Sequence, residues 1–128
     1  MSANRERRAQ VPRWARRLIV GLGTAVIVAA VSGGTLGVLG AAAGSGADAG
    51  RAAAAFAGLA LGVGTPLALV HALVVAPLAA KARHAAWAFV THLVGGALLA
   101  SLLSVTLAPV GALGGAVFFA LERRYGSE

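Results

Sequence analysis

The sequence has no cysteine and only four acidic residues among its 128 positions. The absence of cysteine excludes disulfides, thiolate metal sites and cysteine nucleophiles. All four acidic residues lie outside the long apolar stretches, whereas carriers that couple transport to protons commonly use a carboxylate buried in the membrane. The sequence therefore argues against that mechanism. The acidic residues are Glu6, Asp48, Glu122 and Glu128.

Charged residues of either sign are scarce. They make up 12% of the chain, against about 25% in an average soluble domain, while hydrophobic residues make up 59%. A soluble domain of this length needs a polar surface, and the chain lacks the residues to build one. The composition therefore predicts a single membrane-embedded domain. The abundance of alanine and glycine, with ten arginines for one lysine, indicates a GC-rich bacterial genome.

Uncharged stretches long enough to cross a bilayer follow one another along the chain. At about 1.5 Å per residue, residues 18–43 can span a hydrocarbon core of about 30 Å. The last stretch, from Ala85, has 37 residues and would be about 55 Å long as one helix, too long for one span. We expect two short helices with a turn between Ser101 and Pro109; one tilted helix followed by an interfacial segment is the alternative.

The predicted fold is therefore all-α, a polytopic transmembrane helix bundle of about four spans. A basic cytoplasmic arm is expected before the bundle and a polar cytoplasmic tail after it. The arm covers 1–17, the four-helix domain covers 18–121 with spans near 18–43, 53–80, 85–103 and 105–121, and the tail covers 122–128.

Basic residues are distributed unevenly between the two sides that four spans would define. The arm, the 81–84 loop and the tail hold ten lysines and arginines, and Arg51 stands alone on the other side. Cytoplasmic segments carry such an excess, so both termini are expected in the cytoplasm of a multi-pass plasma-membrane protein. Anionic lipid headgroups are the expected partners of this side, and nucleic acid is not, because the arm forms no recognised binding module. The expected interface anchors are Trp14, Arg16, Arg17, Lys81, Arg83, Arg123 and Arg124.

The first apolar stretch has a rival interpretation as a cleaved export signal. Arg16 and Arg17 precede it, and the alanines at 41–43 fit an A-x-A cleavage site. However, the stretch is longer than the usual apolar region of about 7–15 residues, and no soluble domain follows it. We therefore interpret it as an uncleaved span.

Glycine spacing is the clearest pattern in the chain. Small residues at i, i+4 and i+7 form one face of a helix and let helices approach closely in lipid, where apolar side chains give no driving force for association. The spacing predicts packing within one bundle, with assembly of several copies as the alternative. The expected helix-packing residues are Gly33, Gly37, Gly40, Gly44, Gly58, Gly62, Gly96, Gly111 and Gly115.

Two histidines, His71 and His92, lie inside apolar stretches at about equal distances from the 81–84 loop. If the flanking helices form a hairpin, both histidines lie at the same depth and form a polar pair. The pair is interpreted as a hydrogen bond between helices worth about 1 kcal/mol, with a proton or ion path as the alternative. A metal site is not expected, because no acidic residue or cysteine lies in the spans to complete the ligand set.

Two prolines, Pro66 and Pro77, interrupt the second apolar stretch. In lipid a proline kinks a helix rather than ending it, because neighbouring groups satisfy the freed carbonyls. Pro66 with Gly62 and Gly64 is interpreted as such a kink; an unwound segment that exposes carbonyls to an ion is the alternative.

The sequence predicts a protein without enzymatic activity or cofactor. It shows no nucleophile–base–acid arrangement and no phosphate-binding loop of the G-x-x-x-x-G-K-[ST] type. The first hypothesis is a subunit, scaffold or regulator that acts through helix–helix packing, as a homo-oligomer or with a membrane-protein partner. The second is a small transporter, channel or holin-like pore with the two histidines near its path. The spans contain no continuous polar stripe, which favours the first.

Overall fold

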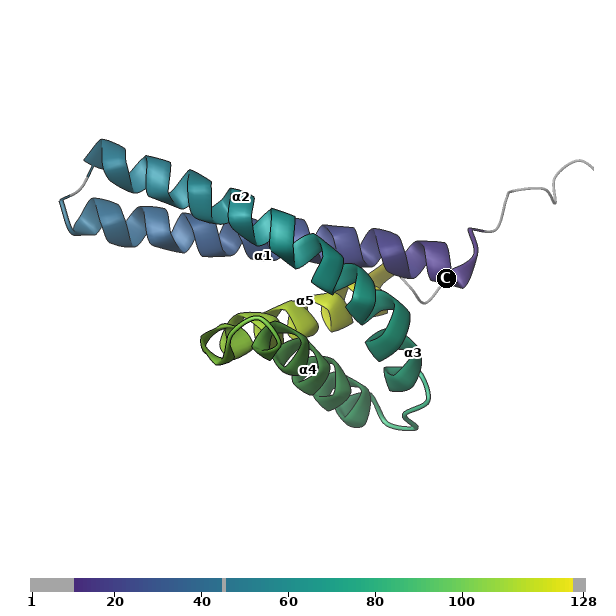
Figure 1. Cartoon of the computed structure of the whole chain (residues 1–128). Helices are drawn as coiled ribbons and strands as arrows, with labels where there is room; N and C mark the ends of the chain where they lie inside the picture. Colours follow the sequence, from purple (N-terminus) through teal and green to yellow (C-terminus); the bar gives the residue numbers. More distant parts are fainter. Residues whose placement is uncertain (1–10, 45, 126–128) are drawn as a thin grey trace, which may run out of the picture.

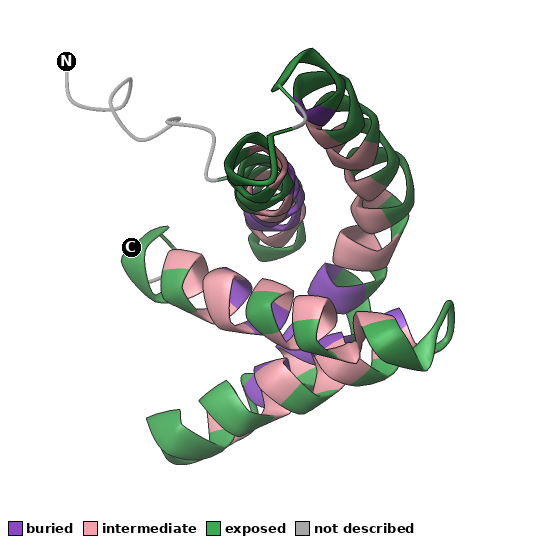
Figure 2. Cartoon of the chain, turned by 90° about the vertical axis from the view of Figure 1, so that its left-hand side faces the viewer, coloured by how far each residue is buried: buried purple, intermediate pink, exposed green. Residues whose placement is uncertain are grey.

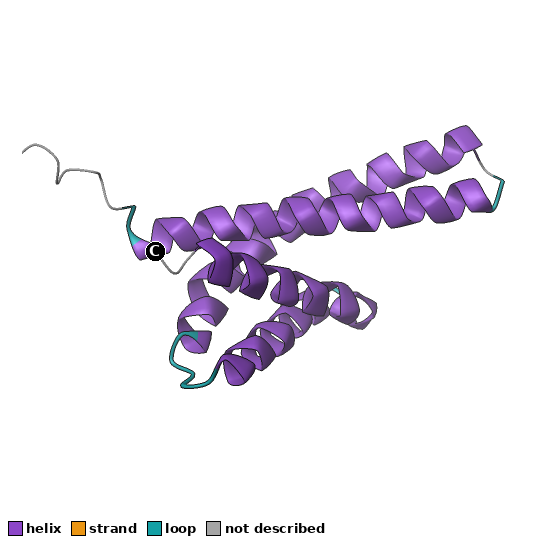
Figure 3. Cartoon of the chain, turned by 180° about the vertical axis from the view of Figure 1, so that it is seen from behind, coloured by secondary structure: helices purple, strands orange, loops and turns teal. Residues whose placement is uncertain are grey.

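In a computed structural model, which describes residues 11–44 and 46–125, the chain is all-α, as predicted. Helix α1 covers Arg13–Ala42, and helix α2 covers Gly46–Val70 (Figure 1). A π-helical turn, η1, at His71–Val75 connects α2 to the short α3 at Ala76–Ala79. Helix α4 covers Ala85–Ser101, and a 3-10 turn, η2, at Val105–Leu107 leads into α5 at Ala108–Tyr125. Figure 3 shows that loops occur only between these elements and at the start of the described chain.

Three of the helical segments have the length and hydropathy of membrane spans, which makes the chain a multi-pass membrane protein. They are Arg13–Ala42, Gly46–Ala79 and Val105–Tyr125. The fourth apolar helix, α4, has 17 residues and is therefore about 25 Å long, slightly less than the hydrocarbon thickness. The predicted break in the last apolar stretch is present, since α4 and α5 are separate helices joined by a short connection.

The helices form two antiparallel pairs that meet near one end of the molecule (Figures 1 and 2). One pair is α1 with α2, the other is α4 with α5, and α1 also packs against α5 and η1. The buried core lies at this meeting point and contains Val20, Ala72, Ala76 and Phe118. The far half of the α1–α2 pair extends beyond the second pair (Figure 1).

Many large apolar side chains are exposed outside this core. Val38 is 70% exposed, Trp87 65% and Leu102 79%. Monomeric soluble proteins rarely expose contiguous apolar surface on this scale, whereas acyl chains solvate it well. The distribution in Figure 2, with buried residues on the facing sides of the helices, is that of a protein surrounded by lipid.

Polar residues extend the helices further than the sequence predicted. Helix α1 begins at Arg13 rather than residue 18, so Trp14, Arg16 and Arg17 belong to the helix and not to an arm. Residues 46–51, predicted as loop, form the first turns of α2, where Asp48 interacts favourably with the positive end of the helix dipole. The turn is therefore short, and Gly44 adopts a φ of +81° that favours glycine.

The end of α5 differs from the prediction in the same way. The sequence predicts Glu122, Arg123 and Arg124 in a tail, but α5 continues through them to Tyr125. The two arginines lie in its last turn, where positive charge is favourable. Residues 1–10 of the predicted arm and 126–128 of the predicted tail lie outside the described residues.

Most of the predicted packing glycines fall into two groups, whereas Gly44 lies in the turn after α1 and not on a helix face. Gly33 and Gly37 lie against α2, where a Cβ at Gly33 would be 2.8 Å from the Cβ of Ala57. Glycines of α4 and α5 are in closer contact still: Cβ atoms at Gly96 and Gly111 would each collide with the other residue's carbonyl oxygen. By contrast, no atom lies within 4 Å of a Cβ at Gly58 or Gly62, which share a face of α2. The α2 motif therefore does not serve packing within the described chain.

Candidate functional site

The structure brings the two membrane histidines into direct contact. His71 begins η1 and His92 lies in α4, and the His71 Nε2 atom is 2.9 Å from the His92 Nδ1 atom. Their rings are stacked, with centroids 5.1 Å apart. His71 is 5% exposed and His92 is 1% exposed, so both imidazoles are removed from solvent and lipid. A polar pair at this depth must satisfy its own hydrogen bonds.

Local backbone geometry helps to place His71. Pro77 has no N–H, so it cannot donate to the carbonyl of Leu73 as a regular helix would require. Just before Pro77 the helix widens into η1, in which the Ala76 N–H bonds to the His71 carbonyl. Such π-turns in α-helices occur frequently at functional sites. Around Pro66, by contrast, α2 remains helical, so the unwound segment considered from the sequence is not present.

Glu122, which the sequence places in a polar tail, joins this pair. Its Oε2 atom lies 3.3 Å from the Nε2 atom of His92. The predicted last span ends at Leu121, its last apolar residue, and therefore excludes Glu122. A signal was available, because Gly111, Gly115, Phe118 and Glu122 are spaced i, i+4, i+7 and i+11 and so share one helix face. Extending the glycine face by one turn would have included the carboxylate.

Arg17 completes the arrangement from α1. Its Nε atom lies 3.2 Å from the Glu122 Oε1 atom, and the two side chains are about a quarter exposed, at 24% and 25%. The sequence predicts that Arg17 is an interface anchor; the structure adds a specific ion pair with a residue 105 positions away. Arg17, Glu122, His92 and His71 thus form a continuous polar chain from a partly exposed ion pair to a buried imidazole.

Aromatic rings shield the inner end of the polar chain. Phe118, which is 1% exposed, lies with its ring centroid 4.9 Å from that of His71 and 5.3 Å from that of His92. Phe119 packs on the other side of His92 and lies beneath the guanidinium of Arg123. In such a low-dielectric setting hydrogen bonds are electrostatically stronger than in water. The Glu122 carboxylate and the two imidazoles are linked one after another and do not surround a common point. No set of metal-ligating side chains is found among the described residues.

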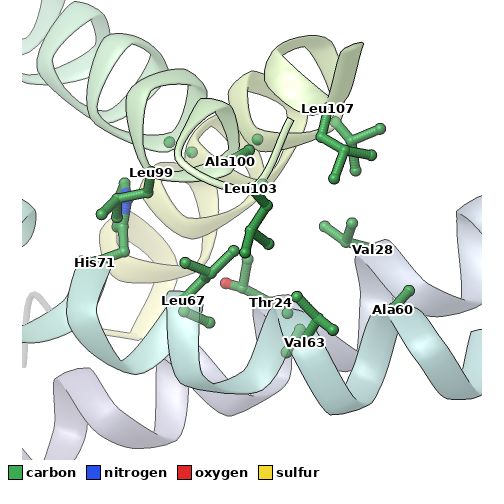
Figure 4. Close-up of a pocket in the computed structure, with 18 of the residues that line it drawn as sticks. Thr24, Val28, Ala60, Val63, Leu67, His71, Leu99, Ala100, Leu103 and Leu107 are labelled. Carbon is green, nitrogen blue, oxygen red and sulfur yellow. The ribbon is translucent and has the colours of Figure 1, made fainter. Parts of the chain in front are cut away.

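A pocket of about 360 Å³ adjoins His71 and is partly open. Figure 4 shows the side chains that line it. Residues from α1, α2, α4 and α5 line it, and nearly all are alanine, glycine, valine, leucine or phenylalanine. Its polar side chains are His71 and Thr24, and the Thr24 hydroxyl already donates to the Val20 carbonyl at 2.9 Å. Figure 4 shows His71 at one end of the pocket, with Val28 and Leu107 toward the other.

Four of the other predicted anchors lie away from this site. Trp14 is 60% exposed at the start of α1, Lys81 and Arg83 are exposed in the loop before α4, and Arg124 lies over the ring of Tyr125. Together, fold and site define a small multi-pass helical membrane protein with a buried polar chain beside an apolar pocket. Comparisons with protein family models, curated proteins and solved structures found no match.

Proposed function

We propose that this chain is a non-enzymatic membrane protein that takes up a lipophilic molecule from the bilayer between its two helix pairs, as a small carrier or a binding subunit. The observation that carries the proposal is the pocket: an apolar space whose inner end is a single buried imidazole. This arrangement matches the usual composition of small-molecule sites, which are mostly apolar with a few placed polar groups.

The size and position of the pocket support uptake from lipid. Its volume of about 360 Å³ lies within the range of about 300–1,000 Å³ for ligand sites. All four long helices contribute to its lining, so a ligand would contact both helix pairs at once. The pairs meet near one end only (Figure 1), which leaves the pocket's surroundings open to acyl chains in the bilayer.

A matched pair of substitutions tests this proposal. Leu103 lines the pocket, whereas the adjacent Leu102 is 79% exposed and does not. In lipid nanodiscs, a photoreactive alkyl chain should label residues of the pocket in the native chain. Leu103→Trp should reduce this labelling several-fold because the indole fills the space, while Leu102→Trp should leave it unchanged. Equal labelling in both variants, or none at the pocket in the native protein, would contradict the proposal.

We also propose that both termini and the 81–84 loop face the cytoplasm. The Arg17–Glu122 pair joins the start of α1 to the end of α5, which supports an arrangement with both described ends on one side. Since the chain has no cysteine, single cysteines can be introduced without background. We expect a membrane-impermeant thiol reagent outside the cell to label Ala47→Cys and not Ala82→Cys. The reverse pattern would overturn the orientation.

The uncovered glycines of α2 favour a second function, in which the protein is a subunit that assembles through helix packing. Gly58 and Gly62 form a GxxxG face with no neighbour in the described chain, and such faces bring helices together in lipid. We propose a second copy of the chain as the partner. The double variant Gly58→Ile, Gly62→Ile should convert a dimer in mild detergent to a monomer, as measured by light scattering. The control Gly34→Ile should leave the dimer intact, although a Cβ at Gly34 also meets no atom within 4 Å. A native protein that is already monomeric would exclude this function.

A further inference from the structure

With both imidazoles neutral, the polar chain has a defined hydrogen-bond direction. The Glu122 carboxylate, paired with the Arg17 guanidinium, offers only acceptor oxygens. A neutral His92 therefore donates its Nε2–H to Glu122, which leaves its Nδ1 as an acceptor. His71 in turn donates its Nε2–H to that atom. A neutral His71 then carries a lone pair on Nδ1, for which the hydrogen bonds found among the described residues give no partner. Since no fully buried side-chain nitrogen there lacks a partner, this atom retains some accessible surface, as expected for a residue that lines the pocket.

We infer that the pocket recognises a lipophilic alcohol or phenol, whose single hydroxyl donates a hydrogen bond to Nδ1 of His71. This inference rests on the proposed uptake of a lipophilic molecule and names its chemical class. His71 lines the inner end of the pocket, so the hydroxyl would lie there and the apolar body would extend past Val63 toward Val28 and Leu107 (Figure 4).

The same polar inventory argues against other headgroups. An ammonium ion brings several donors and a charge, whereas the side-chain acceptors of the pocket are the His71 nitrogen and the Thr24 hydroxyl oxygen, and neither is an anion. A carboxylate would need a cation, and the Arg17 guanidinium is already paired with Glu122. Each extra polar group would be buried without a partner, which is unfavourable. A single hydroxyl has one donor, which the acceptor nitrogen of His71 can satisfy, and it carries no charge.

Two probes of nearly equal shape test the inference. para-Nonylphenol and its methyl ether, para-nonylanisole, share an apolar body, but only the phenol has a donor. Each would compete with the photoreactive alkyl chain for the pocket of the full chain in nanodiscs. We expect the phenol to compete about tenfold more strongly, because the ether leaves the imidazole acceptor unpaired. Equal competition by both probes would overturn the inference while leaving lipophilic uptake intact; absence of pocket labelling would overturn the proposed function itself.

Variants assign the preference to His71. In His71→Phe the two probes should compete equally, and in Thr24→Val the phenol preference should persist. A preference that survives in His71→Phe, with labelling retained, would contradict the assignment. If His71→Phe does not fold, the same question can be tested in the native protein by nuclear magnetic resonance. The ¹⁵N resonance of the His71 acceptor nitrogen should shift when the phenol is added and should not shift when the ether is added. No shift with the phenol would overturn the inference.

Discussion

Replacing Glu122 with leucine is expected to lower the free energy of unfolding by about 2–3 kcal/mol, because it leaves two hydrogen-bonding groups without their partner. The Nε2–H of His92 would lose its acceptor inside a site where the side chain is 1% exposed. Arg17 would lose its carboxylate, although its partial exposure reduces that part of the effect. Thermal or denaturant unfolding in detergent, followed by tryptophan fluorescence, measures the change.

Two companion variants separate the causes. Glu122→Gln keeps an oxygen that accepts from His92 but removes the charge that faces Arg17, so we expect about half the loss. Asp48→Leu also replaces an acidic residue by leucine, but it lies exposed in the first turn of α2 and should change stability by less than about 1 kcal/mol. If Glu122→Leu proves no more destabilising than Asp48→Leu, the polar chain makes no contribution to stability.

Replacing Gly115 with valine should separate α4 from α5, with a loss of about 3 kcal/mol in unfolding free energy. A Cβ at Gly115 would collide with the carbonyl oxygen of His92, and a backbone atom cannot rotate away as a side chain can. Because His92 is the middle of the polar chain, the same change should also increase its distance from Glu122. Unfolding in detergent and protease sensitivity of the 102–104 connection are the measurements.

The adjacent glycine provides the control for this prediction. At Gly114 a Cβ would find only a methyl group of Val28 at 3.8 Å, an ordinary contact. Gly114→Val should therefore retain most of the native stability. Comparable losses in the two variants would show that the effect comes from helix propensity or the pocket rather than from the α4–α5 contact.

The histidine pair shows how far local reasoning can reach. A hairpin about the 81–84 loop joins helices that are adjacent in the sequence. Residues at equal distances from the turn of such a hairpin lie at equal depth in the membrane. The sequence could therefore predict that His71 and His92 lie at one level of adjacent helices. It could not predict that His71 starts a π-turn or which ring nitrogens meet, because these depend on how η1 packs against α4 and Phe118.

Glu122 shows where that reasoning ended. Hydropathy treats a charged residue as the end of a span, since an isolated charge in lipid is costly. The carboxylate is accommodated because Arg17 and His92 bind it from two other helices, and neither partner is near it in the sequence. Likewise, glycine spacing alone could not distinguish Gly115, where a Cβ would meet a backbone carbonyl, from Gly58, where a Cβ would meet no neighbouring helix in the described part of the chain.

The sequence by itself determined that the chain forms four apolar helices and inserts into a membrane, because the transfer of a contiguous apolar stretch into lipid depends on that stretch alone. Only the tertiary structure decided that the helices form two pairs meeting near one end, with a pocket between them and a polar chain beside it. Those features depend on side-chain shape and on contacts such as Arg17 with Glu122, which join residues at opposite ends of the sequence.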